Sequence, residues 1–175
     1  MSQKFDDKGT CYVFEKQNIC FVPITKNAST TVRLSTHSKG YIYTVNNFLE
    51  NPEILAENKS IAILREPLDR FCSGYLEILS RINKSSLTNL EDSFYKIENS
   101  RKRFFKFIEV IQTEGFFDIH IRPQIEFIKK ENGQIMIDKF YLFKEADLLL
   151  KENFNIKNKR RYNSKSVRKK RSLMN

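Results

Sequence analysis

Residues 20–34, CFVPITKNASTTVRL, contain the transition on which the predicted fold depends. An apolar, strand-like run passes directly into Lys26 and then into three hydroxyl residues, Ser29, Thr30 and Thr31. Serine and threonine are favoured where helices begin. The sequence therefore predicts a strand, a short loop, and a helix that begins at Ser29 with a Ser or Thr in its cap position.

The loop of this unit is suited to an anion. The first turn of a helix presents N–H groups and the positive end of the helix dipole, and Lys26 adds an ammonium group beside them. The glycine pattern of triphosphate-binding loops is absent, so a short loop that holds one phosphate group is expected. No aspartate closes a later apolar strand to hold magnesium, which disfavours a nucleotide kinase. The alternative for this loop is an ordinary capped helix beside a surface lysine.

A second predicted strand end repeats the same pattern. Residues 60–67, SIAILREP, are typical of a buried strand that ends at Arg65, and Ser73 follows on the next predicted helix. Ligands of open α/β sheets bind at the carboxyl ends of strands, so Arg65 and Ser73 are candidates to close on one phosphate. The alternatives are an ion pair of Arg65 with Glu66 or Asp69, and a helix serine without a special role.

The remaining segments alternate between strand-like and helix-like patterns. We expect strands at 11–14, 19–24 and 134–143, helices at 67–82, 101–112 and 144–153, and a helical piece within 45–59. This alternation, in a chain of 175 residues, favours a single α/β domain with a mainly parallel central sheet and flanking helices. The phenylalanine-rich stretch RFFKFIEV is expected to pack in the core rather than stack on nucleic-acid bases.

The positive charge is unevenly distributed. The net charge is +10, and nine of these charges belong to residues 157–175, which contain no Asp or Glu. We therefore expect a folded domain at residues 1–156, with a net charge near +1, and a basic tail at residues 157–175. Such a tail is either a solvated segment or a contact for polyanions, including nucleic acid.

The cysteine content and the hydropathy of the chain indicate the cellular compartment in which the protein is expected. Cys11, Cys20 and Cys72 are odd in number and lack metal-ligand spacing, which favours reduced thiols and no metal site. The N-terminal residues have no signal-peptide pattern, and no apolar run is long enough to span a bilayer. A cytoplasmic protein is expected.

Two segments together resemble the donor-binding signature of sulfotransferases that use 3′-phosphoadenosine 5′-phosphosulfate (PAPS). PITKNASTT (23–31) resembles their 5′-phosphosulfate loop, and LREPLDRFCSGY (64–75) resembles their 3′-phosphate motif. DIHIRPQIEF (118–127) is similar to a His-x-x-Pro segment of the carbohydrate sulfotransferase branch, and RRYNSKS (160–166) to a late Asn-Lys-Ser stretch. The resemblance extends over most of residues 11–165.

The resemblance implies a P-loop-like nucleotide-binding architecture and in-line transfer of a sulfuryl group from PAPS to an acceptor hydroxyl, with a glycan expected as acceptor. The product 3′,5′-ADP leaves, and no metal is required. Lys26 is expected to stabilise the charge on the leaving phosphate, and Arg65 with Ser73 to hold the 3′-phosphate. The other donor-binding residues implied are Asn27, Ala28, Ser29, Thr30 and Thr31.

His120 is the candidate general base, because a neutral imidazole suits proton transfer near pH 7. The alternative is a hydrogen-bonded scaffold histidine. Arg122 and Gln124 are expected to hydrogen-bond the acceptor or the donor, whereas His37 is expected in a surface loop. Glu66 and Glu77 are weaker candidates for the base.

Two other functions stay open. One is a nucleic-acid-binding module that uses the basic tail, although no binding fold for nucleic acid is recognisable in the chain. The other is an inactive relative that binds PAPS or 3′,5′-ADP without transferring sulfate.

Overall fold

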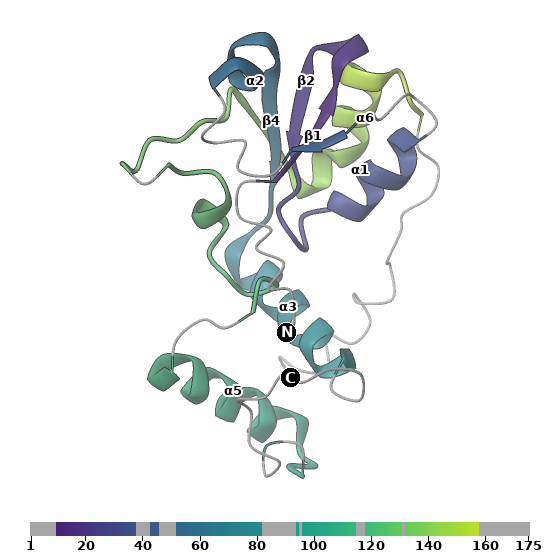
Figure 1. The fold of residues 1–175 in the computed structure, drawn as a ribbon. Helices are drawn as coiled ribbons and strands as arrows, with labels where there is room; N and C mark the ends of the chain where they lie inside the picture. Colours follow the sequence, from purple (N-terminus) through teal and green to yellow (C-terminus); the bar gives the residue numbers. More distant parts are fainter. Residues whose placement is uncertain are drawn as a thin grey trace. The chain divides into compact units, whose positions relative to one another are not determined.

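A computed structural model describes residues 10–37, 43–45, 52–81, 94, 96–114, 118–130 and 132–157 (Figure 1). The chain forms two compact units. The first unit comprises residues 1–70 and 123–162, and the second comprises residues 71–122 and 163–175. The Asn-Lys-Ser stretch at residues 160–166 and nearly all of the basic tail lie outside the described residues.

The first unit contains a five-stranded sheet. The strands in spatial order are β3 (Tyr43–Val45), β1 (Cys11–Phe14), β2 (Ile19–Val22), β4 (Lys59–Leu64) and β5 (Lys139–Leu142). β1 pairs antiparallel with β2 and β3, whereas β2 with β4 and β4 with β5 are parallel pairs. The α/β class is confirmed, and the parallel half of the sheet contains both predicted anion-binding strand ends.

The helices follow the predicted pattern closely. They are α1 (Ser29–Thr36), α2 (Pro52–Glu57), α3 (Pro67–Arg81), α5 (Ser100–Glu114) and α6 (Ala146–Phe154). Three short 3-10 helices are η1 (Glu15–Gln17), η4 (Gln124–Phe127) and η5 (Phe143–Glu145). The predicted strand at 134–143 is shorter than expected, because only Lys139–Leu142 pairs with β4.

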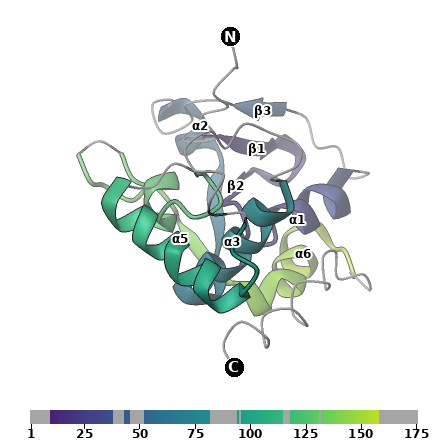
Figure 2. The same cartoon turned by 90° about the horizontal axis from the view of Figure 1, so that it is seen from below.

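The core of the first unit lies between the sheet and two helices. α1 and α6 lie side by side against one face of the sheet (Figures 1 and 2). Alternate residues of the strands point into this core, and Val32 of α1 and the apolar face of α6 pack against them. The fully covered members include Phe14, Phe21, Ile61, Val32, Leu149 and Leu150. This packing fixes where α1 begins relative to the end of β2.

The second unit is held by aromatic packing between two helices. Tyr75 and Ile78 of α3 and Phe107 and Ile111 of α5 are buried in one cluster, which also contains Phe94 and Ile121. The rings of Tyr75 and Phe107 are 4.9 Å apart between centroids. Phe107 of the phenylalanine-rich stretch therefore packs in the core with Phe104 against it, as predicted, whereas Phe105 is exposed.

All three cysteines are buried free thiols. Among the described residues, no group of His, Cys, Asp and Glu side chains could hold a metal ion. Within the same ranges, no helix has both the length and the apolar composition needed to cross a bilayer.

Candidate functional site

The parallel pairing of β2 and β4 brings two loops to the same edge of the sheet. Val22 lies opposite Ala62 near the ends of the two strands, so the segment after β2 and the segment after β4 emerge as neighbours. Arg65 Nη1 donates a hydrogen bond of 3.0 Å to the carbonyl oxygen of Lys26. Lys26 and Arg65, which are 39 residues apart in the sequence, therefore lie at one place in the first unit.

The loop between β2 and α1 achieves its tight turn without glycine. Lys26 and Ala28 both have left-handed backbones, with φ of 67° and 62°. A left-handed conformation costs a non-glycine residue about 1–2 kcal/mol. Ala28 is followed directly by the right-handed helix α1, and such a change of hand turns successive N–H groups toward one side, where they can bind an anion.

The cap of α1 differs from the prediction. The helix begins at Ser29 as expected, but its N-cap residue is Ala28, so the prediction of a Ser or Thr cap was wrong. The left-handed turn places the hydroxyl residues inside the helix and leaves the methyl group of Ala28 at the cap position. Ala28 cannot accept a hydrogen bond from the first-turn N–H groups, which an anion would satisfy. Thr30 is exposed, and Ser29 and Thr31 are half-buried.

Asn27 braces the loop from inside. Its side chain is 1% exposed, and Nδ2 donates 2.7 Å to the carbonyl oxygen of Ile63 in β4 and also donates to Oε1 of Gln124. The side chain thus points into the protein, away from solvent. Its contacts tie the loop after β2 to the end of β4.

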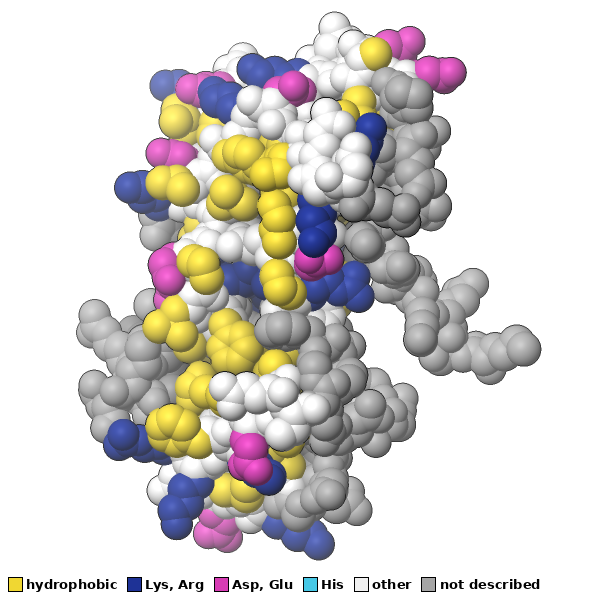
Figure 3. All heavy atoms as spheres, turned by 90° about the vertical axis from the view of Figure 1, so that its left-hand side faces the viewer, with side chains coloured by type: hydrophobic (Ala, Val, Ile, Leu, Met, Phe, Trp, Pro, Cys, Tyr) yellow, Lys and Arg dark blue, Asp and Glu magenta, His cyan; other side chains and the backbone are white. Residues whose placement is uncertain are grey.

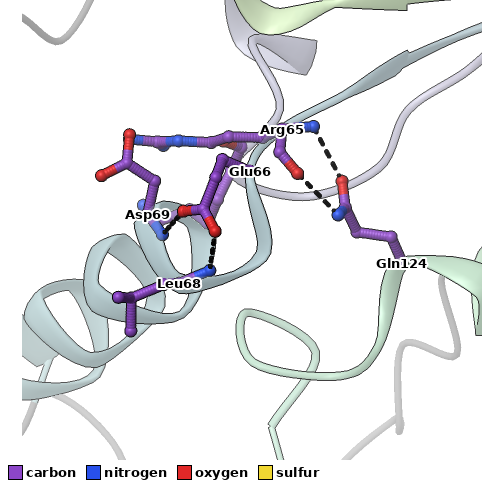
Figure 4. A network of polar contacts seen from close by, with 6 residues as sticks. Arg65, Glu66, Leu68, Asp69 and Gln124 are labelled. Atoms are coloured by element: carbon purple, nitrogen blue, oxygen red, sulfur yellow. Dashed lines mark hydrogen bonds and ion pairs between the residues drawn. The ribbon is translucent and has the colours of Figure 1, made fainter.

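Gln124 pairs with the main chain of Arg65. Arg65 N–H donates 2.9 Å to Gln124 Oε1, and Gln124 Nε2 donates 2.8 Å to the carbonyl oxygen of Arg65 (Figure 4). The expectation was that Gln124 hydrogen-bonds a ligand. Instead, both polar atoms of its side chain hold the residue that follows β4.

The side chain of Arg65 runs along the start of α3, away from Gln124 (Figure 4). Its guanidinium lies 4.5 Å from the centre of the Phe143 ring, and Nη2 is 4.0 Å from Asp69 Oδ2. Glu66 has a different role, because its carboxylate accepts hydrogen bonds from the N–H groups of Leu68 and Asp69 and so caps α3. Of the two partners considered for Arg65, Asp69 is the one beside it.

Arg70 is a member of this site that the sequence reasoning missed. It is 3% exposed, and its guanidinium donates 3.0 Å to the carbonyl oxygen of Thr25 and 3.2 Å to Thr25 Oγ1. Burial, and secondarily the charge of Arg65, lowers the pKa of Arg70 to about 10, so it is protonated at neutral pH. Arg70 lies opposite the apolar face of the predicted helix, so the helical periodicity gave no signal for its burial. Arg70 fixes the loop before Lys26 and adds positive charge to it.

Ser73 and His120 belong to the second unit. Ser73 is buried on α3. His120 is 8% exposed, and its Nδ1 lies 2.5 Å from Oδ1 of Asp118, which also accepts a 2.7 Å hydrogen bond from His120 N–H. With Nδ1 as donor to Asp118, Nε2 carries the lone pair that a general base needs. Asp118 was not predicted, although the Asp-x-His spacing signals such a pair.

The environment of His120 also depends on a glycine. A Cβ atom at Gly74 of α3 would lie 2.4 Å from the carbonyl oxygen of His120. Only glycine allows this approach, so α3 packs directly against the turn that contains His120. His37 is exposed at the end of α1, as expected for a surface residue.

Comparison with known proteins gives one match. A model of a family described as the sulfotransferase family matches residues 10–174, nearly the whole chain. No curated protein and no solved structure matches.

Proposed function

This chain belongs to the sulfotransferase family, and from that premise we propose that it transfers the sulfuryl group of PAPS to an acceptor hydroxyl, with a carbohydrate as the acceptor class. The observation that carries this proposal is the hydrogen bond from Arg65 Nη1 to the Lys26 carbonyl oxygen. It joins the two segments to which we assign the two phosphates of the donor.

The 5′-phosphosulfate is assigned to the loop after β2. Lys26, the first-turn N–H groups of α1 and the hydroxyls of Ser29, Thr30 and Thr31 supply positive charge and donors for it. Asn27 and Ala28 are assigned to the 5′-phosphosulfate through their main-chain groups, because the Asn27 side chain is hydrogen-bonded to Ile63 and Gln124.

The 3′-phosphate is assigned to Arg65, whose guanidinium can donate two parallel hydrogen bonds to phosphate oxygens. Nη2 of Arg65 lies 4.0 Å from Asp69 Oδ2, and a phosphate would compete with this carboxylate for that end of the side chain. Ser73 is assigned to the same phosphate on the resemblance of residues 64–75 to the 3′-phosphate motif of the family.

The reaction forms one sulfur–oxygen bond and breaks another. The acceptor oxygen attacks the sulfur in line with the bridging oxygen, the bond from sulfur to that oxygen breaks, and its electron pair remains on the 5′-phosphate of 3′,5′-ADP. Lys26 stabilises this growing negative charge, which is why its effect falls on the chemical step. The acceptor proton passes to a base, for which we propose Nε2 of His120, oriented by Asp118.

Donor binding and sulfate transfer are tested separately. The full chain is titrated with 3′,5′-ADP, ATP and a DNA oligonucleotide in a thermal-shift assay, and transfer of labelled sulfate from PAPS is measured across glycans, phenols and lipids. We expect stabilisation by 3′,5′-ADP alone and transfer to glycans. Stabilisation by 3′,5′-ADP without transfer to any acceptor indicates an inactive relative, and stabilisation by DNA alone rejects the proposal.

Two variants assign the roles. Lys26→Ala is expected to lower kcat at least about 100-fold with a smaller loss of 3′,5′-ADP affinity, because its charge acts mainly in the transition state. Arg65→Ala is expected to weaken 3′,5′-ADP binding by about 10- to 100-fold, because it removes a charge-assisted hydrogen bond. Lys144→Ala, at an exposed position of the same unit, is the matched control. Full turnover by the Lys26 variant contradicts the assignment.

A further inference from the structure

We propose that Gln124 is a positioning residue that couples the Lys26 loop to Arg65, so that the two phosphate-binding segments act as one site. This inference rests on the proposed function, because it concerns the site to which that function assigns the donor. Gln124 itself is not assigned a contact with the donor. Its role follows from what its side-chain amide holds.

The amide of Gln124 takes the place of a strand at the end of β4. The last residue pair between β4 and β5 is Leu64 with Leu142, and beyond it the N–H and carbonyl groups of Arg65 bond to Gln124 Oε1 and Nε2 at 2.9 and 2.8 Å. This is the pattern by which a neighbouring strand would hold that residue. The main chain of Arg65 is therefore fixed at the point from which its side chain departs.

The same amide also holds the other segment. Gln124 Oε1 accepts a hydrogen bond from Asn27 Nδ2, whose second hydrogen goes to the carbonyl oxygen of Ile63. One oxygen atom thus receives hydrogen bonds from the main chain of Arg65 and from the side chain of the residue after Lys26. Both lone pairs of Oε1 are used, and Nε2 donates in addition.

The requirement for glutamine is specific. The position needs an oxygen that accepts two hydrogen bonds and a nitrogen that donates to the carbonyl oxygen of Arg65. Glutamate at neutral pH has no donor and would place a negative charge against that carbonyl oxygen. Leucine has neither donor nor acceptor. A protonated glutamic acid, however, has one O–H donor and one carbonyl acceptor in nearly the same places as the amide.

Gln124 is well placed to act as a rigid link. It is the first residue of η4, directly after Pro123, and the buried Phe127 holds the other end of this short helix in the first unit. The Lys26 backbone that it stabilises indirectly is left-handed and therefore strained. Without the link, binding of a phosphate at one segment would no longer order the other.

The test compares Gln124→Leu, Gln124→Glu and the control Gln134→Glu, which makes the same chemical change at an exposed position. Dissociation constants are measured by calorimetry on the full chain for 3′,5′-ADP, 3′-AMP, 5′-AMP and adenosine. Relative to adenosine, 3′-AMP and 5′-AMP give the gain in affinity from each phosphate alone. The extra affinity is the factor by which 3′,5′-ADP binds more tightly than the product of these two gains predicts. We expect Gln124→Leu to weaken 3′,5′-ADP binding at least about tenfold and to reduce this extra affinity at least about fivefold.

The pH dependence provides a second readout. Gln124→Glu is expected to bind 3′,5′-ADP poorly at pH 8 and to regain affinity as the pH falls to about 4, because protonation restores the donor to the carbonyl oxygen of Arg65. Each comparison is with wild type and Gln134→Glu at the same pH, which removes the effect of phosphate ionisation. If Gln124→Leu does not fold, this recovery in Gln124→Glu still tests the inference.

Two outcomes overturn the inference. One is wild-type affinity for 3′,5′-ADP in folded Gln124 variants. The other is an equal loss of affinity for all four ligands with no recovery at low pH, which indicates general damage rather than coupling. Failure of wild type to bind 3′,5′-ADP is a different result, because it rejects the proposed function itself.

Discussion

Lys26 combines a strained backbone, which favours glycine, with a charged side chain, which glycine lacks. Its backbone is left-handed, with φ of 67°, in a loop where glycine would relieve the strain, and its side chain supplies the ammonium that the proposed chemistry requires. Strain that persists at a charged residue beside a helix N-terminus is typical of functional sites. The effect of the Lys26 backbone on protein stability can therefore be measured separately from the effect of its ammonium on turnover.

Replacement of Lys26 by glycine and by alanine tests this separation. Both variants lose the ammonium and should lose turnover, but Lys26→Gly should be more stable than Lys26→Ala by about 1 kcal/mol, because only glycine adopts a positive φ without strain. The free energy of unfolding is measured by urea denaturation. Arg33, exposed within α1, is the matched control, and there the glycine variant should be less stable than the alanine variant. The same order of stability at both positions would contradict the strain argument.

The residues show where prediction from the sequence stops. That Lys26 and Arg65 lie near each other was predictable, because each follows a recognisable strand. The cap at Ala28 was not, because its left-handed conformation is imposed by the loop that connects β2 to α1. The role of Gln124 also escaped prediction, since its partners lie 59 and 97 residues away in the sequence.

Helices α3 and α5 pack through the aromatic cluster of the second unit, and this cluster contains the buried hydroxyl of Tyr75. Tyr75 is fully buried, and its hydroxyl has no hydrogen-bond partner among the residues that the structure describes. Burial raises the pKa of Tyr75 to about 12, only partly offset by the charge of Arg103. Burying the unpaired hydroxyl therefore lowers the stability of the fold, and burying the ionised phenolate lowers it further.

The raised pKa fixes the direction of a pH effect. The Tyr75 phenol loses its proton near pH 10 in the unfolded chain and near pH 12 in the folded chain, so its contribution to stability is full below pH 10 and falls by about 2 kcal/mol as the pH rises to 12. Tyr75→Phe should abolish this fall and raise neutral-pH stability by about 1 kcal/mol, because it removes an unpaired hydroxyl. Urea denaturation between pH 7 and 12 measures both effects.

Tyr141→Phe is the control for this prediction. The Tyr141 hydroxyl donates 2.9 Å to Glu152 and accepts from Asn153, so its removal should destabilise the fold. A Tyr75→Phe protein that loses stability above pH 10 as steeply as wild type would show that another group titrates there.

The elements themselves were largely predictable. The β-branched and aromatic runs at β1, β2 and β4 and the apolar faces of α3, α5 and α6 identified those elements within a few residues. β3 was missed, because three residues, Tyr43–Val45, are too short to show an alternating pattern. The parallel register of β2 with β4, on which the site depends, is a property of tertiary packing and follows only from the fold class.

At the scale of the whole molecule, the charge is divided between a nearly neutral part and a basic end. Nine of the ten net positive charges belong to residues 157–175. The face shown in Figure 3 carries acidic and basic side chains among exposed hydrophobic ones. Donor binding is assigned to a few groups of the folded part, most of them buried or half-buried, whereas binding to a polyanion would depend on the basic end. The two therefore differ in their response to salt.

Neutralising the basic end separates these two activities. Replacement of Lys169, Lys170 and Arg171 by glutamine should reduce DNA binding and its dependence on salt, because fewer counterions are released on binding. The salt slope should fall by about one unit for each phosphate that is no longer neutralised. The affinity for 3′,5′-ADP should change less than about twofold, since screening weakens distant charges most.

Fluorescence anisotropy with labelled DNA and calorimetry with 3′,5′-ADP, between 50 and 300 mM salt, measure the two affinities. The wild-type chain at each salt concentration is the reference for both. Because none of the residues to which the donor is assigned belongs to the basic tail at residues 157–175, only the DNA curve should move. A parallel loss of both affinities would place the basic residues in the donor site, and the assignment of the phosphates to Lys26 and Arg65 alone would then be insufficient.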